Sequence, residues 1–280
     1  MSGQRPRRIW LCADDYGISA GVDTAIRDLI VRGRLNATSV MVVAPSFSRS
    51  EAAALDALNA GGTRVAIGLH IVLSAPYRPL SNGFAPLRDG AFPRLARVLL
   101  AALHRRLDQA ALRAEIDAQF SAFADAFGRM PDFIDGHQHV QLFPQIRDAV
   151  LAVAKARTPG AWLRQCGRVT PLRTRIGNGK ALLLDALSRR FRQRAEAAGM
   201  RTNPGFAGAY AFAEEADFAA LFLRFLDHLP ESGVVMCHPG FVDAELRRLD
   251  PLTTLREREY AFLGEEAFPA MLAGHGVTLT

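Results

Sequence analysis

The chain has 280 residues and a formal net charge of +6, with 49% hydrophobic and 22% charged residues. This composition excludes a disordered chain, and the length suits a single α/β barrel with a sizeable core. The positive charge permits an anionic partner without identifying one. No run of about 18 apolar residues occurs, so no membrane-spanning helix is predicted.

The cysteines and the first residues indicate the compartment. Cys12, Cys166 and Cys237 are odd in number, widely separated and set in apolar runs. They show no disulfide framework or metal-binding spacing, which favours a reducing cytoplasm. The N-terminal apolar run ends after a few residues at two aspartates, too early for a signal peptide. We therefore expect a cytoplasmic protein.

Short apolar runs that could form buried strands recur along the chain. Most are continuous rather than alternating, which is typical of parallel strands covered on both faces. They occupy residues 8–13, 39–44, 64–69, 132–136, 161–165, 233–238 and 276–280.

Helical patterns separate these runs. The first helix is predicted to begin after Ser19, a good N-cap, and to end at Gly33. Further helices are predicted over 92–127, 142–157, about 180–199, 214–228 and 265–273.

This alternation predicts a parallel α/β fold with about seven strands. The length fits a closed or nearly closed barrel, and a doubly wound open sheet is the alternative. We expect one domain over residues 1–280, with helical insertions near 74–131 and 166–232.

Two segments, 92–107 and 181–201, are basic and amphipathic. A helix with one face in the core and a basic face in solvent explains both segments. Contact with an anionic membrane surface or an amphiphilic substrate is the alternative.

Polar residues collect at the ends of the predicted strands. In a parallel barrel the carboxyl ends of all strands converge on one face, so these residues are expected to meet there. They are Asp14, Asp15, His70, the run from Asp135 to His139, Arg164 and His238.

One aspartate and two histidines form a ligand set that suits a divalent metal with open positions for water and substrate. Such a metal would lower the pKa of its water and polarise a carbonyl. A second carboxylate could take the proton of that water, and a histidine could protonate the leaving group.

The motifs ADDYG, GLH, DGHQHVQLFP and CHPG, in this order, resemble those of the YdjC-like, or ChbG–HpnK, carbohydrate deacetylases. The resemblance covers most of the chain. It implies an incomplete (β/α) barrel related to NodB-type deacetylases, one divalent metal, Zn or Mg, and hydrolysis of the N-acetyl group of an amino sugar. No nucleic acid is expected as a partner.

The resemblance also implies the roles of five residues. Asp15, His70 and His137 would be the metal ligands, and Asp14 would be the general base. His238 of CHPG would be the general acid or the oxyanion partner.

Other site residues are less closely defined. Arg164 resembles an arginine that orients the base, and a surface salt bridge is the alternative. Gln141 replaces a histidine that is frequent in the family, which leaves His137 and His139 as the pair to consider for the metal. His137 is preferred as the ligand, and His139 is placed nearby, beside the ligands or in contact with substrate. Tyr16 is a candidate substrate-stacking ring or a packed aromatic. Thr38 and Ser39 are expected to be structural, because they lie before and at the first residue of the second predicted strand, away from the expected site.

Within the family, residues 185–212 look most like the hopanoid-biosynthesis branch, HpnK. The expected substrate is then an N-acetylglucosaminyl hopanoid, with peripheral contact at the inner membrane surface. A chito-oligosaccharide, such as diacetylchitobiose or its phosphate, is the alternative. A catalytically silent binding barrel is the alternative of another class, and a homodimer is compatible with a barrel of this size.

Overall fold

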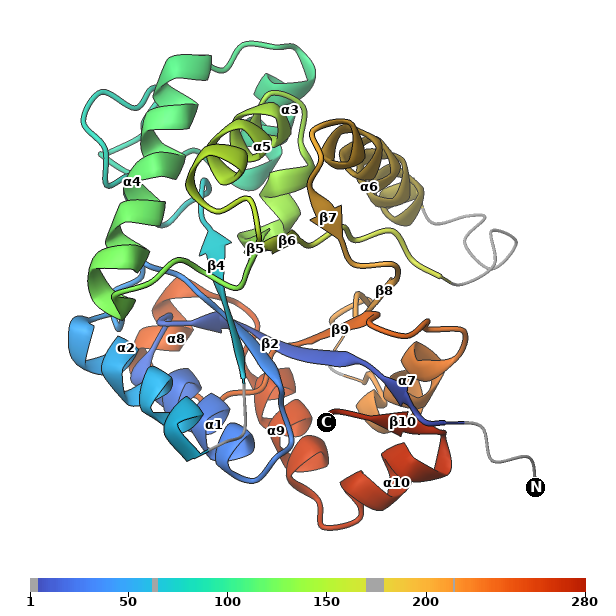
Figure 1. The fold of residues 1–280 in the computed structure, drawn as a ribbon. Coiled ribbons are helices and arrows are strands. Elements are labelled where there is room, and N and C mark those ends of the chain that lie inside the picture. Colours follow the sequence, from blue (N-terminus) through green and yellow to red (C-terminus); the bar gives the residue numbers. More distant parts are fainter. Residues whose placement is uncertain (1–4, 62–64, 170–178, 214) are drawn as a thin grey trace.

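A computed structural model describes residues 5–61, 65–169, 179–213 and 215–280. Its centre is a parallel sheet in the order β7-β6-β5-β4-β3-β2-β9-β8 (Figure 1). The strands are β2 (Trp10–Tyr16), β3 (Ala37–Val40), β4 (Ala66–Ile71), β5 (Phe133–Gly136), β6 (Trp162–Leu163), β7 (Arg201–Thr202), β8 (Phe206–Ala207) and β9 (Val234–Cys237).

The sheet curls into an incomplete α/β barrel, which confirms the predicted fold class. Its edges are β7 and β8, and the described residues form no ladder between these two strands. Two details of the prediction are wrong. The sequence did not indicate β7 and β8, and the run 276–280 is not part of the barrel: β10 (Val277–Thr278) pairs with β1 (Arg7–Arg8) in a separate two-stranded sheet.

Helices cover the outside of the sheet. In sequence they are α1 (Ala20–Val31), α2 (Arg49–Asp56), α3 (Leu95–Leu103), α4 (Gln109–Phe127), α5 (Ile146–Arg157), α6 (Gly179–Ala197), α7 (Phe218–Leu226), α8 (Ala244–Leu249), α9 (Thr254–Gly264) and α10 (Phe268–Gly274), with short 3-10 helices at Ala57–Gly61 and His137–Leu142. Helix α4 packs against α2 and α5, and α9 packs against α1 and α7. None of these helices is long and apolar enough to cross a membrane.

Local chemistry sets the helix ends. The Ser19 hydroxyl accepts a hydrogen bond from the backbone of Val22, as predicted for the start of α1. The predicted helix 92–127 is instead two helices, α3 and α4. The chain breaks at Arg105, whose φ is +55°, and Asp108 caps the start of α4 by accepting from two backbone N–H groups. Helices α2 and α8 were not predicted. The segment 166–232 carries two strands besides its helices, and residues 170–178 and 214 of it lie outside the described residues.

Close packing of side chains across β4, β5 and β6 depends on one glycine. A Cβ at Gly68 on β4 would lie 2.4 Å from the ring of Phe133 on β5. Phe133 in turn stacks on Trp162, with ring centroids 4.5 Å apart. Only glycine leaves room for this ring, so the ring packs tightly across β4, β5 and β6.

A buried aspartate ties α1 to the loops that follow β2 and β3. Asp23 accepts hydrogen bonds from the backbone N–H of Gly17 at 2.5 Å and from the Ser46 hydroxyl at 2.7 Å. Burial outweighs these bonds and raises the pKa of Asp23 to about 7. The folded protein therefore keeps a proton on Asp23 that the unfolded chain loses near pH 4.

Because the folded state holds more protons on this group, its contribution to the free energy of unfolding decreases as the pH rises from about 4 to about 7. We predict that Asp23→Asn removes this component. Chemical denaturation at pH 5 and pH 7.5 should show a smaller loss of stability in the variant than in wild type. Asp125→Asn, at an exposed position of α4, is the control and should keep the wild-type pH dependence. Equal pH dependence in wild type and D23N would contradict the prediction.

Candidate active site

A row of polar side chains crosses the carboxyl end of the barrel on five neighbouring strands. The strand register pairs His70 with Asp135 and places Ile134 beside Leu163, so that Arg164 follows next to Asp135. Adjacent positions of parallel strands direct their side chains to the same face. The row consists of Asp14, Ser39, His70, Asp135 and Arg164, and each of these residues is at most 2% exposed.

The adjacent aspartates reach one cavity because the strand is irregular at this point. In a regular strand, neighbouring side chains point to opposite faces. Between Ala13 and Tyr16, however, β2 shifts register against β3, and Asp15 adopts φ +69°. Aspartate tolerates the left-handed region better than most residues. Asp14 and Asp15 consequently both line the cavity at the end of the barrel.

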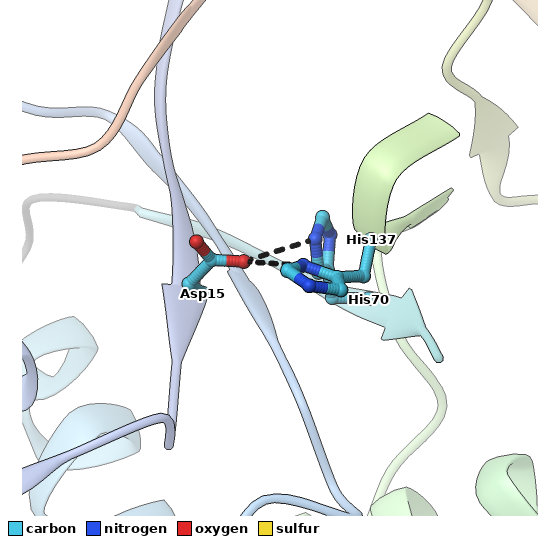
Figure 2. A group of neighbouring side chains, drawn as sticks. All are labelled: Asp15, His70 and His137. Atoms are coloured by element: carbon cyan, nitrogen blue, oxygen red, sulfur yellow. Dashed lines mark hydrogen bonds and ion pairs between the residues drawn. The ribbon is translucent and has the colours of Figure 1, made fainter. Parts of the chain in front are cut away.

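Asp15, His70 and His137 converge on one point from three elements (Figure 2). Asp15 Oδ1 lies 3.0 Å from His137 Nδ1 and 3.3 Å from His70 Nε2. One potential ligand atom of each residue lies within 4.8 Å of the others. Two imidazoles and a carboxylate at this spacing fit a single divalent cation and leave positions open toward the cavity. The predicted ligand set is thus brought together.

The charges around this cluster are strongly coupled. Burial opposes the ionisation of Asp15, but Arg256 and His137 outweigh it and lower the pKa of that carboxyl well below its usual range. Burial also opposes protonation of His70, but Asp135, Asp15 and Asp14 raise its pKa to about 10. Negative charge therefore dominates at His70, which favours a cation at this point.

Arg164 is a buried anchor for two carboxylates. Its Nη1 donates to Asp14 Oδ2 at 2.6 Å and its Nη2 donates to Asp14 Oδ1 at 2.7 Å. The same Nη2 lies 2.7 Å from Asp135 Oδ2. Burial opposes ionisation of Asp14, and Arg164 lowers the pKa of this carboxyl below its ordinary value. The arginine is fully buried, so the alternative of a surface salt bridge is wrong.

Sequence reasoning missed Arg256, a second buried arginine. It donates from Nη2 to Asp15 Oδ2 at 2.6 Å and to Asp250 Oδ2 at 2.9 Å. Arg256 therefore holds the oxygen of Asp15 that faces away from the two histidines. It belongs to the charged run REREY on α9, where no motif distinguishes it from solvent-exposed arginines.

His238 and His139 lie on the wall of the same cavity. The backbone N–H of His238 donates to buried Glu259, its ring packs edge-on against Phe212, and its Nδ1 is buried without a partner among the described residues. His139 has Nδ1 3.5 Å from the sulfur of Cys166, and burial lowers its pKa to about 3. His139 is therefore neutral at physiological pH, and it lies beside the predicted ligands rather than among them.

Two expectations at this site need correction. Tyr16 does not line the cavity: it is fully buried, and its hydroxyl bonds with Arg27 and Glu51, so it is the packed aromatic. Ser39 is not remote from the site. Its hydroxyl lies 3.0 Å from His70 Nδ1 and 3.4 Å from Asp14 Oδ1. Thr38, in contrast, bonds to the backbone of Ala13 and has the expected structural position.

The cavity has a volume of about 580 Å³, in the range of small-molecule sites. Its polar lining includes the two aspartates and the two predicted histidine ligands, and its walls come from distant segments. These include Leu95 at the start of α3, Phe212, Met236 and the stretch from Asp250 to Arg256. The fold and the site together define an incomplete α/β barrel with a candidate mononuclear metal centre at the carboxyl ends of its strands.

The chain belongs to the YdjC-like protein family, whose sequence profile matches residues 8–274. Relatives include the chitooligosaccharide deacetylases of Escherichia fergusonii and of Salmonella paratyphi B, which are 28% and 29% identical over 240 residues. In both cases the match covers 84% of this chain and 82% of the relative. A crystal structure of a candidate cellobiose-phosphate cleavage protein from Enterococcus faecalis superposes with a TM-score of 0.73 at 20% identity, covering 98% of this chain and 97% of that one.

The buried pairs of Arg164 yield a prediction about stability. Arg164→Met removes the positive charge between Asp14 and Asp135, so that Asp14 loses both of its ion-pair contacts and Asp135 keeps only His70. Breaking such a pair costs about 3–5 kcal/mol of unfolding free energy. Arg248→Met, whose side chain is 71% exposed and paired with Glu245, is the control and should change stability by less than about 0.5 kcal/mol. Similar stabilities of the two variants in urea denaturation would refute the anchor role.

Proposed function

We propose that the protein is a metal-dependent carbohydrate deacetylase that hydrolyses the N-acetyl group of an amino sugar. The observation that carries the proposal is the convergence of Asp15, His70 and His137 beside Asp14 in one cavity. The chitooligosaccharide deacetylases among the relatives support the same activity.

Asp15, His70 and His137 would hold one divalent cation, through Oδ1, Nε2 and Nδ1 respectively. When bound, the ion supplies a water of lowered pKa and polarises the acetyl carbonyl. Zn and Mg are both candidates. Two imidazoles favour Zn over Mg, which prefers oxygen ligands.

Asp14 would accept the proton of the attacking water. Its carboxylate is ionised because Arg164 binds both of its oxygens, and this geometry also fixes its orientation. A carboxylate of low pKa is a weak base. It can serve here because the water itself is acidified at the cation site.

His238 would donate a proton to the departing amine. It directly follows β9 and lines the cavity. Its Nδ1 is buried, so Nε2 is the nitrogen that would donate. Glu259 accepts a hydrogen bond from the backbone N–H of His238 and not from its ring. The ring itself is positioned by packing against Phe212.

The substrate class best supported is a chito-oligosaccharide, because that is the substrate in the names of the relatives. The N-acetylglucosaminyl hopanoid is the second candidate, and a specific surface favours it. Between residues 78 and 106, four exposed leucines accompany six exposed arginines and a single acidic residue, Asp89. We call this set the basic–apolar surface: Arg78, Leu80, Leu87, Arg88, Arg94, Arg97, Leu100, Leu103, Arg105 and Arg106.

The basic–apolar surface adjoins the cavity. Leu95, the first residue of α3, lines the cavity, while Leu100 and Leu103 of the same helix are 57% and 48% exposed. The solvent face of a helix is ordinarily polar. Leucines among arginines on such a face are typical of helices that rest on anionic lipid, and a lipid-linked sugar would then enter the cavity past Leu95.

Released acetate distinguishes the substrates. Purified protein loaded with Zn²⁺ or Mg²⁺ should release acetate from diacetylchitobiose if the first candidate is right, and from N-acetylglucosaminyl hopanoid if the second is right. Metal removal by a chelator should abolish the release. A protein that binds metal and releases no acetate from either compound, or from other N-acetylated amino sugars, is not a deacetylase.

Variants of the site residues separate chemistry from metal binding. Asp14→Asn should retain metal and lose about 10²–10⁴-fold in kcat, because the proton acceptor is gone. His70→Ala and His137→Ala should lose metal in elemental analysis, since each removes one ligand. His104→Ala, at an exposed position after α3, is the control and should keep both metal and activity. Unchanged metal content in H70A and H137A would rule out this ligand set.

Binding to vesicles tests the second substrate candidate. The protein should sediment with phosphatidylcholine vesicles that contain phosphatidylglycerol and remain free with phosphatidylcholine alone. The double change L100Q/L103Q should weaken this binding at least about tenfold, because burial of each leucine stabilises the bound state by about 1.5 kcal/mol or more. Val31→Gln, at a 70% exposed apolar position ending α1, is the matched control. Equal sedimentation with both vesicle types would exclude an anionic-lipid surface.

A further inference from the structure

We propose that Asp135 is a positioning residue that links the metal half of the site, which consists of Asp15, His70 and His137, to the base half, which consists of Asp14 and Arg164. It fixes which nitrogen of His70 faces the cation, and it anchors the arginine that orients Asp14. This inference rests on the proposed function for its catalytic consequence, but its effect on metal binding does not.

The contacts of Asp135 run in two directions. Its Oδ1 lies 2.7 Å from His70 Nδ1, and its Oδ2 lies 2.7 Å from Arg164 Nη2. Asp135 and Arg164 are both 0% exposed, and His70 is 2% exposed. Each oxygen of one fully buried carboxylate thus serves a different half of the site.

The strand register makes this bridge possible. Asp135 pairs directly with His70 across β4 and β5, and Arg164 follows the residue that pairs with Ile134. The three side chains are therefore lateral neighbours on one face, at spacings fixed by the sheet rather than by a loop.

The direction of the hydrogen bond decides which His70 nitrogen can bind metal. A carboxylate only accepts, so His70 must carry its proton on Nδ1 when the ring is neutral. Nε2 then presents its lone pair toward Asp15, 3.3 Å away. A carboxylate behind a metal-binding histidine fixes the tautomer in this way and raises the basicity of the ligand.

An amide cannot replace the carboxylate of Asp135 in both contacts. If the amide oxygen of the D135N variant faced His70, its NH₂ group would face the guanidinium of Arg164, which has only donors. If the NH₂ group faced His70 instead, the ring would need its proton on Nε2 and could not bind metal there. Either orientation therefore abolishes one of the two contacts, with Arg164 in the first case and with His70 in the second.

The primary experiment measures metal affinity in D135N. Metal-free wild type and variant are titrated with Zn²⁺ in competition with a chromophoric chelator, and the visible absorption of the Co²⁺ form reports the ligand set. We expect D135N to bind Zn²⁺ about 10–100-fold more weakly, with an altered Co²⁺ spectrum, and to show lower kcat at saturating metal. Wild-type affinity and an unchanged spectrum in a folded variant would overturn the proposal.

Two further variants test whether the effect on Zn²⁺ binding is specific to Asp135. Asp185→Asn makes the same substitution at another buried aspartate, which accepts from the backbone of Arg168, and should leave Zn²⁺ affinity unchanged. Ser39→Ala removes the other group near His70 Nδ1, at 3.0 Å. If S39A weakens Zn²⁺ binding as much as D135N does, the histidine is not set by Asp135 and the proposal fails.

A measurement on the wild type keeps the test independent of the folding of D135N. In the Zn²⁺-loaded protein, ¹⁵N chemical shifts should show His70 protonated at Nδ1 and coordinated at Nε2. Coordination through Nδ1 would overturn the proposal. Absence of acetate release by a wild type that shows this protonation pattern would refute the proposed function and leave the inference about Asp135 standing.

Discussion

The site depends on the compensation of three buried carboxylates by two buried arginines. Asp14, Asp15 and Asp135 are each at most 2% exposed, and all three lie at the same end of the barrel. Arg164 binds Asp14 and Asp135, and Arg256 binds Asp15. Removal of a charge from water costs several kcal/mol per ion, and only close pairing with hydrogen bonds offsets that cost. The buried ion pairs therefore fix the positions of the three carboxylates at this end of the barrel.

This compensation makes the two adjacent aspartates unequal. Arg164 occupies both oxygens of Asp14, so this carboxylate has a fixed orientation toward the cavity. Arg256 occupies only one oxygen of Asp15 and leaves the other toward the histidines. Asp250 shares the charge of Arg256, which reduces the repulsion that this arginine would exert on a cation nearby. Because the backbone is irregular at Asp15, the two adjacent aspartates lie on one face and bind different arginines.

The sequence was sufficient to predict the barrel and most of the polar row, because strand-end residues follow continuous apolar runs. It was not sufficient for Ser39, since the second strand was predicted at 39–44. The observed strand, Ala37–Val40, places Ser39 near its carboxyl end, where the site lies. Arg256 was missed because its burial depends on the packing of α9, which carries charge along its length. The strands β7 and β8 have two residues each, too few to leave a hydrophobic pattern.

The reacting groups and the walls of the cavity come from different parts of the chain, with different physical constraints. The groups proposed to react lie on or directly after strands, where strand register and buried ion pairs hold them. The walls come from Leu95, Phe212 and the stretch 250–255, which are supplied by long connections between strands. Apart from Asp250, which pairs with Arg256, such connections can change in length and composition without disturbing the buried charges. The sheet therefore positions the polar groups of the site. Under the proposed function, the choice between a soluble oligosaccharide and a lipid-linked sugar would depend on the connections, above all on α3, which carries Leu95 in the cavity wall and the exposed Leu100 and Leu103.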